Sequence, residues 1–314
     1  MTTDELDRSY RLRRDERAPD GIRRIVEGQL ASAREQLEDV EPGWLGESVH
    51  ATRKHLKRLR AALRLTRDAI APETYERENG SFRVAGQRLS AGRDSAVIIQ
   101  TLDELHERFP DALAPEATAA LRERLVQERA DAYVALDEPE GGREAALGTI
   151  SDAQARTAGW LFPQDGVEAL SPGLKRIYLR GRKRMDRAGD EPTSENLHEA
   201  RKRVKDLWHA AQILRPAAPK RMKRLADDAH DVADLLGDEH DLAVLRDHVE
   251  RHPQCFEDED SKDALVGLIE RRRRALRRKA LKRGRRLYTR SPKKFIAAIE
   301  RGWRKRVEPK PLSG

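Results

Sequence analysis

Apolar residues along the chain recur mostly at spacings of three and four, and alternating runs of β-branched residues are essentially absent. This spacing is typical of amphipathic α-helices that bury one narrow apolar stripe. Segments rich in Pro, Gly, Asp and Ser interrupt the pattern at 41–48, 107–115, 137–142, 162–166, 188–196 and 215–220. The pattern therefore predicts an all-α protein of roughly twelve helices and no sheet.

Two of the predicted helices have closely similar sequences. HATRKHLKRL, starting at residue 50, aligns with HEARKRVKDL, starting at residue 198, in the pattern H-x-x-R-K-x-[LV]-K-x-L, so the offset is 198 − 50 = 148. Two further pairs of segments keep the same order along the chain: GIRRI and GLKRI lie before the motif helices, and LSAGRD and LGDEHD lie after them. We therefore predict a tandem duplication of about six helices per copy. One domain, 1–314, would hold a first repeat at 18–160 and a second at 170–306.

The composition fits long helices with large solvent-exposed surfaces better than a single dense hydrophobic core. Hydrophobic and charged residues each make up 38%, and aromatic residues only 4%. The net charge of +8 indicates a polyanionic partner: nucleic acid, a phosphate polymer or an anionic membrane surface. A single cysteine, Cys255, rules out an intrachain disulfide. No apolar run approaches the ~20 residues of a membrane span, and the N-terminus lacks the apolar core of a signal peptide. We expect a cytoplasmic protein.

The cations of the two similar helices fall on one edge of each helix. A helical wheel places Leu56, Leu59 and Leu63 in an apolar stripe, and the basic residues on an arc beside it. The second copy repeats the stripe with Leu197, Val204, Leu207 and Ala211, and has Trp208 in place of Arg60. Carboxylates are missing from both arcs, although a merely solvated helix normally alternates its charges. This favours an anion site over a solvated face.

His50 and His198 precede the Arg-Lys pair of each copy by one turn. A bound phosphate would favour the protonated imidazole, whose unperturbed pKa is near 6.5, so both histidines are candidate phosphate contacts. A structural role is the alternative for each. No catalytic role is assigned to either.

The third repeated block ends in Arg93-Asp94 in one copy and His240-Asp241 in the other. Its aspartate either pairs with the basic helix or lies at a helix N-terminus. The same region also suggests a metal site, because it is rich in imidazole and carboxylate side chains. These are His230, Asp231, Asp234, His240 and Asp241. No third ligand stands at a motif spacing, so neither a metal nor another cofactor is predicted.

The run at 271–286 has eleven basic residues among sixteen and no acidic ones. Such density favours polyanions through counterion release. Tyr288 is the only aromatic residue near it, which argues against stacking on single-stranded bases. No helix-turn-helix, RNA-recognition or zinc-finger pattern occurs, so specific nucleic-acid recognition is not expected.

The paired H-x-x-R-K-x-x-K helices and the duplicated LG…RD blocks resemble the CHAD family, the conserved histidine α-helical domain. The resemblance covers about residues 18 to 306. It implies two pseudo-symmetric helical bundles around a basic cleft or pore that binds inorganic polyphosphate, and association with polyphosphate granules. Many members are fused to a triphosphate-tunnel (CYTH) catalytic domain. No E-x-E-x-K stretch occurs here, so a stand-alone binding module is implied, with no enzymatic activity and no obligate protein partner.

The resemblance places the site on the motif positions, and the repeat adds basic residues that match one another. Ser90 and His240 depart from the Gly and Arg-Asp that the family pattern has there. The alternatives are a metal-dependent phosphohydrolase and nonspecific binding of nucleic acid or an anionic surface. The predicted polyphosphate contacts are His50, Arg53, Lys54, Lys57, Arg60, Arg23, Arg24, Arg93, His198, Arg201, Lys202, Lys205, Lys175, Arg176 and His240.

Overall fold

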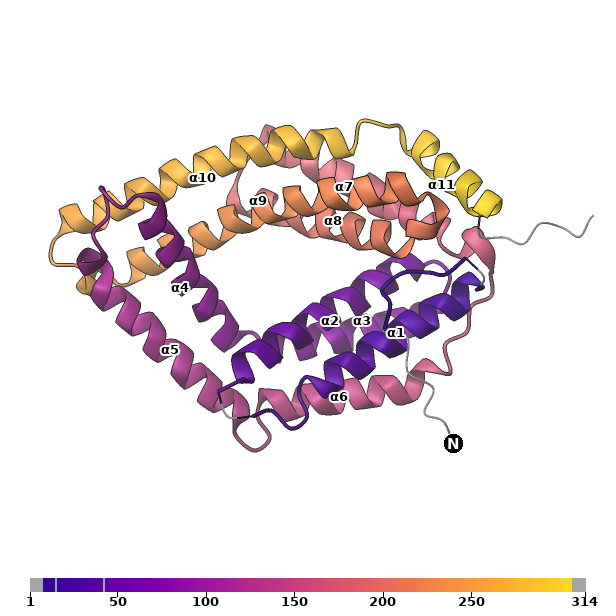
Figure 1. The fold of residues 1–314 in the computed structure, drawn as a ribbon, viewed down its shortest axis with the longest axis horizontal. Coiled ribbons are helices and arrows are strands. Elements are labelled where there is room, and N and C mark those ends of the chain that lie inside the picture. The colour runs from indigo at the N-terminus through magenta and orange to yellow at the C-terminus, as the bar shows by residue number, and fades with distance from the viewer. Residues whose placement is uncertain (1–7, 15, 42, 307–314) are drawn as a thin grey trace, which may run out of the picture.

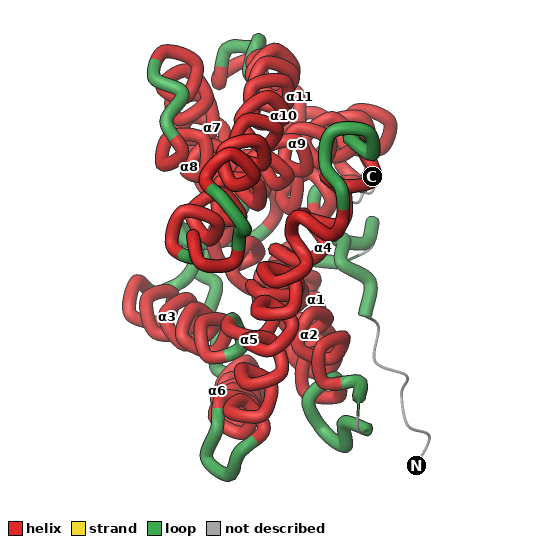
Figure 2. The backbone as a smooth tube through the Cα atoms, turned by 90° about the vertical axis from the view of Figure 1, so that its left-hand side faces the viewer, coloured by secondary structure: helices red, strands yellow, loops and turns green. Residues whose placement is uncertain are grey.

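The computed structural model describes residues 8–14, 16–41 and 43–306. Within these residues the chain forms eleven α-helices, four short 3₁₀ turns and no strand, which confirms the all-α prediction (Figures 1 and 2). The helices are α1 (Ala18–Glu35), α2 (Leu45–Thr66), α3 (Pro72–Arg88), α4 (Ala91–Arg108), α5 (Ala119–Asp137), α6 (Gly142–Thr157), α7 (Ser171–Asp190), α8 (Ser194–Ile213), α9 (Pro219–Arg251), α10 (Glu259–Leu287) and α11 (Pro292–Arg306).

The helices that carry the repeated motif follow the predicted hydrophobic pattern. In α2, Leu56, Leu59 and Leu63 are buried, and in α8 so are Val204 and Leu207. The hydroxyl of Thr193 accepts a hydrogen bond from the backbone N–H of Asn196 and caps the start of α8. The apolar stripe thus fixes which edge of each helix is left for the charged residues.

Helices α1, α2, α3 and α6 lie in the lower part of Figure 1, and α7 to α11 lie in the upper part. In the lower part α1 packs against α2, and in the upper part α7 packs against α8. The chain between α3 and α4 leaves the helical conformation at Leu89 and Ser90, whereas α9 runs uninterrupted through 33 residues. The tandem duplication itself stays a prediction.

Two apolar clusters hold the molecule together. The larger one runs through α1, α2 and α6 and continues into α7, α8 and α9. The smaller one joins α4 and α5 to α9 and α10, through the buried side chains of Leu102, Leu125, Leu245 and Ile269. Helix α2 also packs against α8, and α4 packs against α9. The motif helices therefore meet in the interior of one continuous body.

None of the described helices combines the length and the apolar character that crossing a bilayer requires.

Candidate anion-binding site

The second copy of the motif brings two histidines and two cations together. His198 of α8 faces His240 of α9, with ring centroids 4.4 Å apart and an interplanar angle of 35°. Burial, followed by His240, Lys202 and Arg201, lowers the pKa of His198 to about 4. The Nδ1 atom of His198 is buried and has no hydrogen-bond partner among the described residues. Burial is the largest cause of the lowered pKa, and the positive charges of Lys202 and Arg201 add to it, which is the sign of charge that an anion site requires.

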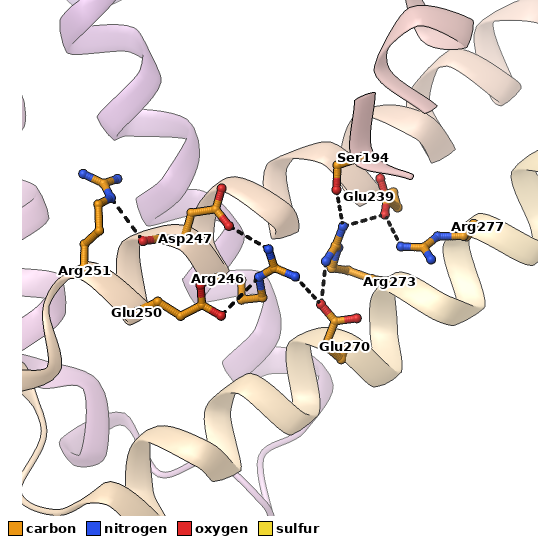
Figure 3. A network of polar contacts seen from close by, with 9 residues as sticks. All are labelled: Ser194, Glu239, Arg246, Asp247, Glu250, Arg251, Glu270, Arg273 and Arg277. Atoms are coloured by element: carbon orange, nitrogen blue, oxygen red, sulfur yellow. Dashed lines mark hydrogen bonds and ion pairs between the residues drawn. The ribbon is translucent and has the colours of Figure 1, made fainter. Parts of the chain in front are cut away.

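Two of the carboxylates close to this group form ion pairs with other residues. Glu199 forms an ion pair with Lys202, with 2.8 Å between Oε1 and Nζ. Glu239 precedes His240 but contacts two arginines of α10 instead, Arg273 at 3.0 Å and Arg277 at 2.9 Å (Figure 3). Asp241 and Glu239 still raise the pKa of His240, but burial and Arg201 outweigh them and the pKa is lowered.

Figure 3 also corrects part of the sequence interpretation of the run at 271–286. The side chain of Arg273 is only 2% exposed and is held by Glu239, Glu270 and Ser194. Arg277 shares Glu239, so two cations of the run tie α10 to α9 and do not face a polyanion. Other cations of the run are exposed: Arg271, Arg274, Arg278, Lys279, Lys282, Arg283, Arg285 and Arg286.

The guanidinium of Arg201 lies directly against the backbone of α9. A Cβ atom added at Gly237 would come within 2.9 Å of Arg201 Nη2. The missing side chain at Gly237 therefore makes room for this guanidinium beside His240. Lys205, one turn beyond Arg201 on α8, is half-buried.

The first copy holds its arginines against α3. Arg53 donates a hydrogen bond to the backbone carbonyl of Gly86, near the end of α3. Arg60 Nε donates to Asn79 Oδ1 at 3.2 Å. Burial, and after it the charge of the neighbouring Arg64, lowers the pKa of Arg60 to about 10, while Asp206 acts in the opposite direction. His50 is half-buried, and Lys54 and Lys57 are exposed.

The two basic edges are connected at a buried aspartate. Asp206 of α8 contacts Arg64 of α2 at 2.9 Å and Arg203 of its own helix at 2.8 Å. Arg176 of α7 donates to the backbone carbonyl of Arg64 at 2.7 Å, and it also pairs with the carboxylate of Asp68. Burial and Arg203 lower the pKa of the adjacent Arg180.

The sequence does not predict three of the residues at this contact: Arg180, Arg203 and Asp206. One pattern could have indicated the aspartate, because the 148-residue offset aligns Asp206 with Arg58. Asp206 is thus an acidic residue where the other copy is basic, and an ion pair between two basic copies requires such an exchange of charge. Arg180 and Arg203 follow no repeated motif, so only the folded arrangement identifies them.

The remaining predicted residues are more scattered. Arg23 donates to Asp20 at 3.3 Å and to the carbonyl of Trp160 at 3.0 Å. Arg24 pairs with Glu16 at 2.6 Å and also donates to backbone carbonyls near residue 10. These contacts fasten α1 to the segment before it and to the loop after α6. Lys175 is exposed on α7, and the side chain of Arg93 lies outside the described residues.

The histidine and aspartate residues at 230–241 do not gather into a metal site. His230 pairs with Asp234 at 2.7 Å, and Asp231 pairs with Arg283 at 2.9 Å. His240 turns toward His198 instead. Among the described residues, the one group of three with metal-ligand geometry lies elsewhere, at Glu128, His248 and His252.

A family model described as CHAD domain matches residues 28–250. The crystal structure of the CHAD domain from the plant Ricinus communis is similar at a TM-score of 0.65 and 17% identity, covering 93% of this chain and 94% of that one. PptA from Streptomyces chartreusis is similar at a TM-score of 0.59 and 18% identity, covering 86% of this chain and 99% of that one. At these identities the two structures show the fold alone. No curated protein sequence matches the chain.

Proposed function

The chain belongs to the CHAD domain family, and from that premise we propose that it binds inorganic polyphosphate through the basic edges of α2 and α8. Members of the family are linked to polyphosphate binding or to polyphosphatase-like functions. The observation that carries the proposal is the facing pair of His198 and His240 beside Arg201 and Lys202. We propose a binding module without enzymatic activity, associated with polyphosphate granules in the cytoplasm.

Polyphosphate chemistry suits these side chains. Each arginine offers a planar fork of donors to phosphate oxygens, and each lysine offers a compact point charge. A histidine beside a phosphate gains a proton and becomes a donor at both ring nitrogens. Such a site selects for charge density along a chain, and it needs no device for recognising bases.

The contact between the motif helices supports one continuous binding surface over two separate ones. Arg64 of α2 reaches Asp206 of α8, so the basic edge of the first copy runs up to that of the second. Arg60 lies one turn before Arg64, and Lys205 lies one residue before Asp206. We propose that a long phosphate chain follows both edges across this contact.

The exposed cations of α10 support a competing function, which is nonspecific binding of polyanions. Eight cations of the run at 271–286 are exposed, and an extended basic helix face attracts DNA as readily as polyphosphate. The two functions differ in the surface that the anion occupies and in their selectivity. Charge-matched competitors separate them.

The test is a competition titration in which polyphosphate and duplex DNA of matched charge displace a labelled polyphosphate, while free phosphate is monitored. We expect polyphosphate to displace the label at much lower charge concentration than DNA, with no release of phosphate. Equal displacement by DNA would assign the binding to α10 and contradict the proposal. Steady release of phosphate would instead make the protein a phosphohydrolase.

A further inference from the structure

Three side chains with metal-binding atoms meet where α5 packs near the end of α9. Glu128 Oε2 and His248 Nε2 lie 3.1 Å apart. The ligand atoms of Glu128, His248 and His252 all lie within 4.8 Å of one another. His248 and His252 are four residues apart, and their ring centroids are separated by 5.2 Å. No residue of this group is among the predicted polyphosphate contacts; His248 lies two turns beyond His240 on α9.

Two imidazoles and a carboxylate are a donor set that binds zinc in other proteins. Zinc takes imidazole nitrogen at about 2.0–2.1 Å and carboxylate oxygen at about 2.0–2.2 Å. Two such ligands on a tetrahedral ion are separated by roughly 3.4 Å, so the 3.1 Å between Oε2 and Nε2 needs little adjustment. Two histidines and one glutamate leave a fourth position for water, as in other three-ligand zinc sites.

We propose that Glu128, His248 and His252 bind a zinc ion that ties α5 to the end of α9. The site goes beyond the proposed polyphosphate function and does not depend on it. Glu128 and the two histidines come from chain segments more than one hundred residues apart. A single ion there would brace the smaller apolar cluster, to which α5 and α9 both contribute.

Two arginines face the group, and they act differently. Arg124 Nε contacts Oε1 of Glu128 at 2.9 Å, which leaves Oε2 on the side of His248. Arg251 Nη2 donates to His248 Nδ1 at 2.8 Å, which places the ring proton on Nε2. Zinc at Nε2 moves that proton to Nδ1, and a donor facing Nδ1 then opposes the metal. Arg251 is exposed and turns away at the cost of one hydrogen bond.

This conflict provides a discriminating experiment. Zinc chloride is titrated calorimetrically into the full chain without polyphosphate, and thermal midpoints are recorded with and without zinc. We expect one zinc per chain and a raised midpoint. His252→Gln should weaken binding by more than about tenfold. Arg251→Gln should tighten it, because a glutamine oxygen can accept the proton on Nδ1 where the arginine cannot.

His230→Gln is the matched control, since His230 also pairs with a carboxylate four residues away, on an exposed face of the same helix. His230→Gln should bind zinc as tightly as the parent. Glu128→Gln removes a proposed ligand and should bind zinc more weakly. Equal binding by the parent and His252→Gln would overturn the proposal. Loss of binding in His230→Gln would overturn it as well, and so would weaker binding in Arg251→Gln.

Discussion

The imidazoles of His198 and His240 face one another across the contact between α8 and α9, with 4.4 Å between their centroids. Burial lowers the pKa of both rings; Arg201 adds to this effect at His240, and His240 adds to it at His198. Both rings are therefore neutral in the free protein at neutral pH. An anion placed between these rings and the neighbouring cations reverses the balance, because it favours each protonated form. Proton uptake and anion binding are coupled at this pair.

The first prediction concerns pH. In the free protein His198 protonates only near its pKa of about 4, and bound phosphate raises that value toward the ordinary one near 6.5. Between these limits binding takes up protons, so the affinity for polyphosphate should rise as the pH falls from about 6.5 to about 4. Calorimetry at about pH 6 in buffers of different ionisation enthalpy measures the uptake. His198→Gln with His240→Gln should reduce it, and unchanged uptake in that variant would contradict the coupling.

Much of this group could be predicted from the sequence, because helical geometry fixes neighbours along one helix. Residues three and four positions apart share a face, so the motif alone places His198, Arg201 and Lys202 on one edge of α8. The buried stripe of Leu56, Leu59 and Leu63 follows from the same rule. These features need no knowledge of how the helices pack.

Contacts between helices could not be predicted in the same way. The basic run at 271–286 gives no indication that Arg273 is buried, since its partner Glu239 is 34 residues away on α9. Asp206 likewise acquires Arg64 only when α2 meets α8. The side chains of Glu128 and His248 are 120 residues apart and have no motif in common. Each of these pairs depends on tertiary packing, which local periodicity does not encode.

The second prediction removes one arginine from each motif helix. Arg53→Ala with Arg201→Ala should weaken polyphosphate binding by at least about tenfold, because charge-assisted hydrogen bonds contribute about 1.5–3 kcal/mol each. The hydrogen bond from Arg53 to the carbonyl of Gly86 contributes about 1 kcal/mol, so the loss of stability should be smaller than the loss of binding free energy. Fluorescence titration measures the affinity, and thermal melting measures the stability.

The matched control for that variant removes the same charge elsewhere. Arg122→Ala with Arg224→Ala deletes two exposed arginines, from α5 and α9. Its affinity at moderate salt should stay close to that of the parent. If the control loses as much affinity as the motif variant, then net charge accounts for the binding and the motif edges do not.

The third prediction separates binding from stability at Gly237. A methyl group there meets Nη2 of Arg201 at 2.9 Å, so the guanidinium must move away from His240. Alanine in a helix interior is otherwise more favourable than glycine by about 0.5–1 kcal/mol. Gly237→Ala should therefore weaken polyphosphate binding without lowering the melting temperature. Gly267→Ala is the control, because nothing lies within 4 Å of its added methyl group; a loss of affinity there would remove Arg201 from the explanation.

The fourth prediction concerns the network that holds α9 against α10 (Figure 3). Glu239 is 1% exposed and binds both Arg273 and Arg277, and the side chain of Arg273 is 2% exposed. Glu239→Gln leaves the positive charge of Arg273 buried with less compensation, and breaking a buried pair costs about 3–5 kcal/mol. Urea denaturation should show a lower midpoint at an unchanged slope.

The exposed end of the same network supplies the comparison for Glu239. Asp247 pairs with Arg246 at 2.9 Å, and its side chain is 57% exposed. Asp247→Asn should therefore cost less than about 1 kcal/mol, the usual range for a surface ion pair. Since His240 follows Glu239 directly, Glu239→Gln should also weaken polyphosphate binding, whereas Asp247→Asn should not. Equal losses of stability in both variants would mean that the buried carboxylate does not hold α9 in place, and that His240 is positioned by apolar packing alone.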